Sequence, residues 1–253
     1  MVNKARNILI TGGTGKIGAV LVEKMILDGH NVVFTTTTSE NGENLISKIN
    51  PFLNNQELKY LILDLEKQDS FEEKISGLPI KIDTVIHNAR SLDSLKIGGN
   101  GITTSQNFLK EFEIAVVAPY LLNYSLISYN HPLNDIIYIA SIYASVAPNK
   151  SLYDNFDEQS PIQYGVSKAA QIHSVKELAV RFSDKGIKVN AISYGGVEGR
   201  ASQDFIERYN KLNPSGKMLN EDDLYPPVQF LLNNKGLNIT GENIKIDGGW
   251  TIW

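Results

Sequence analysis

The sequence of 253 residues contains no cysteine, which excludes disulfide bridges, thiolate chemistry and zinc sites built on cysteine. Its four histidines are scattered without the spacing of a metal site, so no metal ion is expected. The net charge is −4 and no run of lysine and arginine stands out, so neither nucleic acid nor an anionic membrane is an expected partner. No apolar stretch has the length of a membrane span or of a signal-peptide core. These absences predict a soluble cytoplasmic protein.

Short β-branched segments alternate with longer helical segments, which is typical of βαβ units around a parallel sheet. The expected strands are residues 8–11, 31–37, 58–63, 84–87, 135–140, 188–192 and 243–246. The expected helices are residues 16–29, 42–50, 67–77, 104–130, 162–184, 202–212 and 221–233. Because no linker or repeat interrupts this pattern, we expect residues 1–253 to form one α/β domain. That domain would be a doubly wound Rossmann fold with about seven parallel strands flanked by helices.

Two polar loops, residues 90–101 and 146–161, follow expected strands and are long enough to have a function. Ligands of doubly wound sheets bind beyond the carboxyl ends of the strands, so both loops should overhang the ligand. Residues 149–159 are rich in hydrogen-bonding groups, which suits a sugar or sugar phosphate. Lys150 and Arg200 could meet a phosphate. A solvated insertion without a ligand role is the alternative.

The segment TGGTGKIG at residues 11–18 joins the first expected strand to the first expected helix. Glycines there permit a tight turn and let a pyrophosphate approach the positive end of the helix, so the segment predicts a dinucleotide site. A carboxylate at the end of the second strand would hold the ribose of NAD, but residues 34–39 read FTTTTS. Threonine hydroxyls with Lys16 favour the 2′-phosphate of NADP, whereas Glu40 keeps NAD open.

Tyr164 and Lys168 are four residues apart in an expected amphipathic helix, so their side chains share one face. A phenol titrates near pH ~10, and a neighbouring ammonium lowers its pKa, which would let Tyr164 exchange a proton near neutral pH. An ordinary pair on a helix surface is the alternative.

The chain resembles the short-chain dehydrogenase/reductase family over nearly its whole length. The landmarks of that family occur in its order: the glycine loop, Asp64-Leu65, His87-Asn88-Ala89-Arg90, Ser141, and Tyr164 with Lys168. The resemblance implies an NAD(P)-dependent oxidoreductase that transfers a hydride to or from a secondary alcohol or ketone. It also implies a homodimer or homotetramer.

The resemblance implies three catalytic residues. Ser141 would orient the substrate oxygen, Tyr164 would exchange its proton, and Lys168 would bind the nicotinamide ribose and lower the pKa of Tyr164. Ser151 is nearer to Tyr164 in the sequence but occupies a polar loop, so Ser141 at a strand end is preferred. The implied cofactor-binding residues are Gly12, Thr14, Gly15, Lys16, Ile17, Gly18, Thr37, Asp64, Leu65, Asn88, Ala89, Tyr164, Lys168, Gly195 and Val197.

More narrowly, residues 140–143 (ASIY), 146–149 (VAPN) and 247–252 (DGGWTI) resemble one branch of this family. That branch is associated with bacterial surface-glycan and flagellin-glycosylation gene clusters, which make nonulosonic acids. It implies a sugar-like substrate.

Several positions depart from the family pattern. They are Lys16 and Arg90 in place of glycine, Ala115 in place of an asparagine that holds a proton-relaying water, Tyr194 in place of proline, and Gly199 near a common threonine. These departures keep a non-catalytic dinucleotide-binding or redox-sensing protein as a rival. A nucleotide-sugar epimerase or dehydratase is a further alternative, which the glycine spacing favours and the short segment after Asn190 opposes. His87 is expected to be packed rather than catalytic, and Trp250 and Trp253 form an apolar tail.

Overall fold

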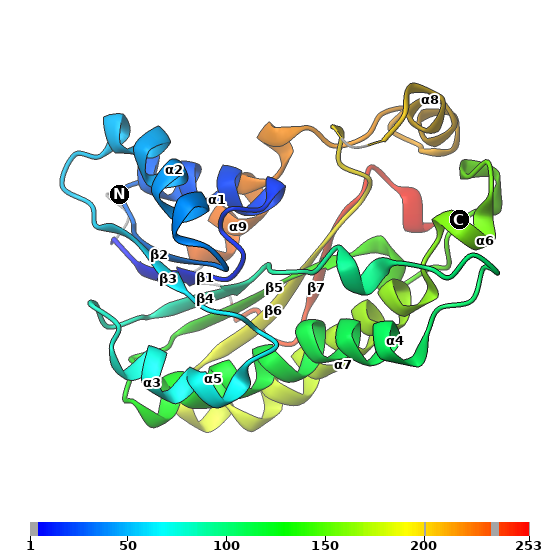
Figure 1. The fold of residues 1–253 in the computed structure, drawn as a ribbon. Coiled ribbons are helices and arrows are strands. Elements are labelled where there is room, and N and C mark those ends of the chain that lie inside the picture. Colours follow the sequence, from blue (N-terminus) through cyan, green and yellow to red (C-terminus); the bar gives the residue numbers. More distant parts are fainter. Residues whose placement is uncertain (1–4, 200, 234–237, 253) are drawn as a thin grey trace.

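The computed structural model describes residues 5–199, 201–233 and 238–252, and it contains one sheet covered by helices on both faces (Figure 1). The strands are β1 (Asn7–Ile10), β2 (Asn31–Thr36), β3 (Leu58–Ile62), β4 (Thr84–His87), β5 (Asp135–Ser141), β6 (Lys188–Tyr194) and β7 (Asn243–Ile246). Their order is β3-β2-β1-β4-β5-β6-β7, and every neighbouring pair is parallel. The predicted α/β fold with seven parallel strands is confirmed.

Two layers of helices cover the sheet (Figure 1). One layer contains α1 (Lys16–Leu27), α2 (Ser39–Ile49) and α9 (Tyr225–Leu232). The opposite layer contains α3 (Phe71–Ser76), α4 (Ser105–Phe112), α5 (Ala118–Ser128) and α7 (Ile162–Arg181). Two further helices, α6 (Phe156–Gln159) and α8 (Gln203–Leu212), lie beyond the carboxyl ends of β5 and β6. Among the described helices, none is both long and apolar enough to cross a bilayer.

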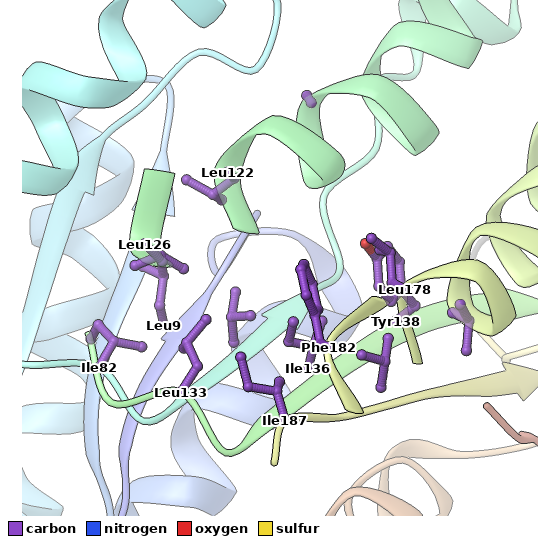
Figure 2. Close-up of a cluster of buried hydrophobic side chains, with 14 of the residues drawn as sticks. Leu9, Ile82, Leu122, Leu126, Leu133, Ile136, Tyr138, Leu178, Phe182 and Ile187 are labelled. Atoms are coloured by element: carbon purple, nitrogen blue, oxygen red, sulfur yellow. The ribbon is translucent and has the colours of Figure 1, made fainter. Parts of the chain in front are cut away.

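Strand β5 is buried on both faces of the sheet. All seven of its residues are buried, and alternate side chains enter the two cores. Ile136 and Tyr138 pack with Leu122 of α5 and Leu178 of α7 (Figure 2). Ile137 faces the opposite core. A strand buried on both faces is rich in β-branched and aromatic residues, as expected for a central parallel strand.

The single helix expected at residues 104–130 is instead two helices joined by a π-helical turn, η4 (Glu113–Val117). In a regular α-helix the Ala115 carbonyl would accept the N–H of residue 119, but that residue is Pro119 and has no N–H. A loop was expected at residues 146–161, but this segment contains α6. Helix α2 begins earlier than expected because the Thr38 hydroxyl accepts the Asn41 N–H and caps it.

The chain order places a ligand crevice between β1 and β4. From β1 the chain adds β2 and β3 on one side, and then continues with β4 on the other side. The helices that leave the two central strands therefore diverge, and a cleft opens at their carboxyl ends. The glycine loop follows β1 and Asn88 follows β4, so both lie at this point.

Candidate active site

A cleft of about 1130 Å³ lies at this switch point and receives residues from the loops after β1 to β6. It brings together nearly all residues predicted from the sequence: Gly12, Thr14, Gly15, Lys16, Ile17, Thr37, Asp64, Leu65, Asn88, Ala89, Ser141, Tyr164, Lys168, Gly195 and Val197. Gly18 is the exception, since it is buried behind the loop rather than in the cleft wall.

Hydrogen bonds fix the backbone shape of the glycine loop, which leaves the start of α1 open. Gly12 has a φ of +66°, which favours glycine, and its N–H donates to the Thr35 hydroxyl at 3.0 Å. The Asn88 amide donates to the carbonyls of Thr11 and Gly12, both at 3.1 Å. Asn88 therefore holds the loop in shape. Gly15 caps α1 without a side chain, so the first N–H groups of the helix face the cleft as an anion site suited to a pyrophosphate.

The end of β2 offers fewer free hydroxyls than its threonine run suggests. Thr35 and Thr36 are buried, and the Thr36 hydroxyl is 3.3 Å from both the Thr14 hydroxyl and the Thr38 carbonyl. Thr37 is exposed and lines the cleft, whereas Glu40 does not line it.

Lys16 extends toward the loop after β6. A Cβ atom added to Gly199 would lie only 2.2 Å from the Lys16 Nζ, so the ammonium lies directly against Gly199. That position suits a contact with a pyrophosphate that crosses the glycine loop.

Ser141, Tyr164 and Lys168 meet on the other side of the cleft. Ser141 ends β5, and its hydroxyl oxygen accepts the Tyr143 N–H at 3.2 Å. The Lys168 Nζ is 5.9 Å from the centre of the Tyr164 ring, one helical turn away on α7. The Arg90 guanidinium lies 5.7 Å from the centre of the same ring, and Tyr143 packs edge-on against it. The departure at Arg90 thus places a second cation beside the tyrosine.

Lys168 is a buried cation, with only 5% of its surface exposed. Its ammonium donates to the Ile139 carbonyl at 2.9 Å and to the Gln171 Oε1 at 3.0 Å. Burial lowers its pKa to about 8, while the charge of Glu111 acts to raise this pKa and that of Arg90 acts to lower it. A lysine with this pKa exchanges its proton close to neutral pH.

Two residues near Lys168, Glu111 and Gln171, were not predicted from the sequence. Glu111 is buried on α4, and its carboxylate accepts hydrogen bonds from Ser94 and Ser167. Burial raises its pKa, whereas the two hydroxyls and the charge of Lys168 lower it. The sequence signal available for Gln171 was its position on the helix face that also carries Lys168 and Val175.

The substrate end of the cleft is more aromatic than expected. The hydroxyls of Tyr143 and Tyr153 are 2.9 Å apart, and Tyr153 comes from the loop at residues 146–161. Tyr209 stacks on Trp250 with ring centres 4.4 Å apart, and its hydroxyl accepts the Gly196 N–H. Arg208 also lines the cleft, and its guanidinium donates a hydrogen bond of 2.9 Å to the Asp154 carboxylate.

Other sequence candidates lie elsewhere. The Ser151 hydroxyl donates to Asn149 outside the cleft wall, and Lys150 lies over Phe156. His87 is buried against Asn123, as a packed histidine would be. Arg200 and Trp253 lie outside the described residues. Within the described ranges, no group of three or more histidine, aspartate or glutamate side chains could hold a metal ion.

Comparison with known proteins connects this geometry to a family. The family model described as enoyl-(acyl carrier protein) reductase matches residues 14–251. Post-translational flagellin modification protein A of Campylobacter coli is 28% identical over 271 residues, covering 97% of this chain and 98% of the relative. The 3-oxoacyl-(acyl-carrier-protein) reductase FabG of Buchnera aphidicola is 27% identical over 256 residues, covering 96% of each chain.

A solved structure has the same fold. It is the short chain dehydrogenase of Leptospira borgpetersenii with bound NAD+, which has a TM-score of 0.82 and 26% identity. The alignment covers 99% of this chain and 94% of the Leptospira chain.

Proposed function

The chain belongs to the short-chain dehydrogenase/reductase family of NAD(P)-dependent oxidoreductases, and from this premise we propose that it interconverts a secondary alcohol and a ketone on a sugar-like substrate. The resemblance to the flagellin-glycosylation branch supports a sugar, and the flagellin modification relative is consistent with that branch. The Tyr143 and Tyr153 hydroxyls also supply donors and acceptors for a polyhydroxylated ligand. The absence of cysteine fits a cytoplasmic enzyme.

The cleft residues divide into two groups along its length. The N–H groups at the start of α1, with Thr14 and Lys16, would hold the pyrophosphate of the cofactor. Asp64 and Leu65 would flank the adenine, and Lys168 would contact the nicotinamide ribose. When bound, the nicotinamide supplies or accepts the hydride at the substrate carbon.

The proposed chemistry of the chain is proton transfer at the substrate oxygen. The Ser141 hydroxyl donates a hydrogen bond to that oxygen, and the Tyr164 phenol gives its proton to it during reduction or takes a proton from it during oxidation. The Lys168 ammonium, one helical turn away on α7, stabilises the negative charge that the Tyr164 oxygen carries as a phenolate. The observation that carries this proposal is the meeting of Ser141, Tyr164 and the buried Lys168 in one cleft.

The first test is cofactor binding, followed by a substrate screen. Titration with NADPH and NADH should show a Kd well below about 1 mM, which corresponds to roughly −4 kcal/mol. With the cofactor bound, keto sugars and sugar nucleotides should be reduced faster than a 3-oxoacyl thioester. Binding of neither cofactor would reject the proposed oxidoreductase, and binding without reduction of any substrate would favour the non-catalytic dinucleotide-binding rival. Faster thioester reduction would reject the sugar.

Tyr164→Phe then tests the proton transfer. It should lower kcat at least ~100-fold and keep the cofactor Kd unchanged, because it removes the acid/base group alone. Retained turnover would reject the role of Tyr164.

For the cofactor we propose NADP rather than NAD. Among the residues lining the cleft at the end of β2 are Thr35, Thr36 and Thr37, without the carboxylate that would hold an NAD ribose. A lower Kd for NADH than for NADPH would overturn this choice.

We also propose a homodimer or homotetramer. Such an assembly would cover exposed apolar side chains on the helices of one layer. These are Leu109 and Phe112 of α4, Tyr120 and Tyr124 of α5, and Val166 of α7. Light scattering should give a mass of at least twice the 28.1 kDa of the chain, and a monomer would reject the proposal.

A further inference from the structure

Gln171 is a buried amide in a position that otherwise belongs to the apolar core of α7. Only 2% of its surface is exposed, and Val175, one turn further along, is fully buried. A buried amide lowers stability unless its polar atoms are hydrogen-bonded. Both of its polar atoms have partners: Oε1 accepts from the Lys168 Nζ at 3.0 Å, and Nε2 donates to the Ala115 carbonyl at 3.0 Å.

The Ala115 carbonyl is available because of the local sequence. It lies in the π-helical turn η4, and the N–H that a regular helix would offer to it is absent at Pro119. The amide of Gln171 donates to this carbonyl from the neighbouring helix, in place of the donor that Pro119 lacks. The amide of Gln171 thus connects the Lys168 ammonium to the Ala115 carbonyl, the group that has lost its helical donor at Pro119.

We propose that Gln171 is the positioning residue of Lys168, bridging its ammonium to the Ala115 carbonyl and holding it charged in the cleft. Two N–H groups of the ammonium are directed to the Ile139 carbonyl and to Gln171, which leaves the third for the cleft. An amide neither gains nor loses a proton near neutral pH, so Gln171 orients the ammonium without exchanging protons with it.

The ionisable groups around Lys168 come from four elements. Glu111 faces it from α4 and Arg90 from the loop after β4, with opposite effects on its charge. Tyr164 lies on α7 itself, and Tyr143 packs on Tyr164 from the turn after β5. Gln171 adds a neutral acceptor at hydrogen-bond distance, which stabilises the ammonium in addition to Glu111.

Two substitutions at Gln171 change the ionisation of Lys168 in opposite directions. Gln171→Leu removes the acceptor, so the ammonium is less stable and the Lys168 titration midpoint should move about one pH unit lower, from about 8. Gln171→Glu places a carboxylate at the ammonium, so the midpoint should move at least about one pH unit higher. A residue with a purely structural role would give no such opposition.

The titration is measured by NMR on protein with ¹³C-labelled lysine and without cofactor, and Lys168→Ala assigns the signal. Asn190→Leu is the matched control, because Asn190 is also a buried amide with two hydrogen bonds to the backbone, but it does not line the cleft. The Lys168 midpoint in Asn190→Leu should equal that in the wild type. If Gln171→Leu fails to fold, Gln171→Met replaces it. Unchanged midpoints, or shifts in one direction for both variants, would overturn the proposal.

A kinetic measurement separates this inference from the proposed function on which its catalytic meaning rests. Loss of the ammonium at high pH should end carbonyl reduction, so the alkaline limb of kcat should move with the Lys168 midpoint in each variant. If the NMR midpoints move oppositely and the limb stays fixed, the Gln171 bridge stands and the proposed role of Lys168 fails. If neither moves, the bridge itself is wrong.

Discussion

The N–H of Tyr143 donates a hydrogen bond of 3.2 Å to the hydroxyl oxygen of Ser141. Because this bond uses the oxygen as an acceptor, the hydroxyl hydrogen of Ser141 remains free to be donated. Ser141 is 7% exposed at the end of β5 and lines the cleft, so its oxygen has a fixed position. The local structure thus makes Ser141 a hydrogen-bond donor for a substrate oxygen.

Ser141→Ala should lower kcat about 100-fold in the reduction of the ketone, because one donor to the developing negative charge is lost. The cofactor Kd should stay at the wild-type value. Steady-state kinetics and fluorescence titration measure the two quantities. Ser151→Ala is the control, since the Ser151 hydroxyl is bonded to Asn149 outside the cleft wall. Loss of turnover in Ser151→Ala together with retained turnover in Ser141→Ala would transfer the role to the loop serine.

His87 should make the protein less stable in acid. Burial lowers its pKa from the usual 6.5 to about 4, against a smaller opposing effect of its hydrogen bond to Asn123. Below pH 6.5 the unfolded chain therefore binds more protons than the folded chain, and stability falls as the pH falls from 6.5 toward 4. This one group should contribute a loss of about 2.5 kcal/mol between pH 7 and pH 4.5.

Urea unfolding at the two pH values measures that loss. In His87→Gln the difference between pH 7 and pH 4.5 should shrink by about the same 2.5 kcal/mol. His173→Gln is the control, because the His173 side chain is 74% exposed on α7 and should leave the difference unchanged. Equal differences in the wild type and His87→Gln would show that His87 is not the group responsible.

The sheet could be predicted from the sequence because each strand carries its own signal. Residues 136–140 of β5 are five consecutive apolar or aromatic residues suited to burial on both faces, and the regular alternation with helices indicates a parallel sheet. The break in the segment at residues 104–130 was missed, because apolar periodicity continues through Ala115 and Pro119. The missing N–H of a proline inside a helical pattern was the signal that predicts it.

The cleft residues could be predicted where the family pattern identifies them. The contacts that each side chain makes within the cleft could not be predicted from the sequence. Lys16 was expected beside a 2′-phosphate at the end of β2, but its ammonium lies against Gly199 in the loop after β6. Gln171 was missed because a sequence does not reveal that its two amide atoms join Lys168 to a carbonyl on another helix. Such contacts depend on how the helices pack.

Gly18→Ala should damage the dinucleotide site although Gly18 does not line it. An added Cβ would lie 2.2 Å from the Gly12 carbonyl oxygen and 2.9 Å from the Asn88 amide nitrogen, so the glycine loop would have to move. The free energy of unfolding should fall by about 1–3 kcal/mol, as for an overpacked core, and the cofactor Kd should rise. Chemical denaturation and NAD(P)H titration test both.

Gly77→Ala is the control for this substitution. A Cβ at Gly77 would meet its nearest atom at 3.6 Å, which is an ordinary contact. Its stability and its cofactor Kd should stay near those of the wild type. A Gly18→Ala protein with wild-type stability and affinity would show that the loop tolerates displacement and that Gly18 does not shape the site.

Thr37→Asp should reverse the proposed cofactor preference. Thr37 is exposed and lines the cleft at the end of β2, whereas the Thr36 hydroxyl is already hydrogen-bonded. A carboxylate there accepts the ribose hydroxyl of NADH and repels the 2′-phosphate of NADPH, so the Kd ratio should change at least ~10-fold, about 1.4 kcal/mol, toward NADH. Thr38→Asp is the matched control: it adds the same charge one residue further on, outside the cleft wall, and aspartate keeps the helix cap. An equal change in both variants would indicate a long-range charge effect, and no change in Thr37→Asp would place the 2′-phosphate elsewhere.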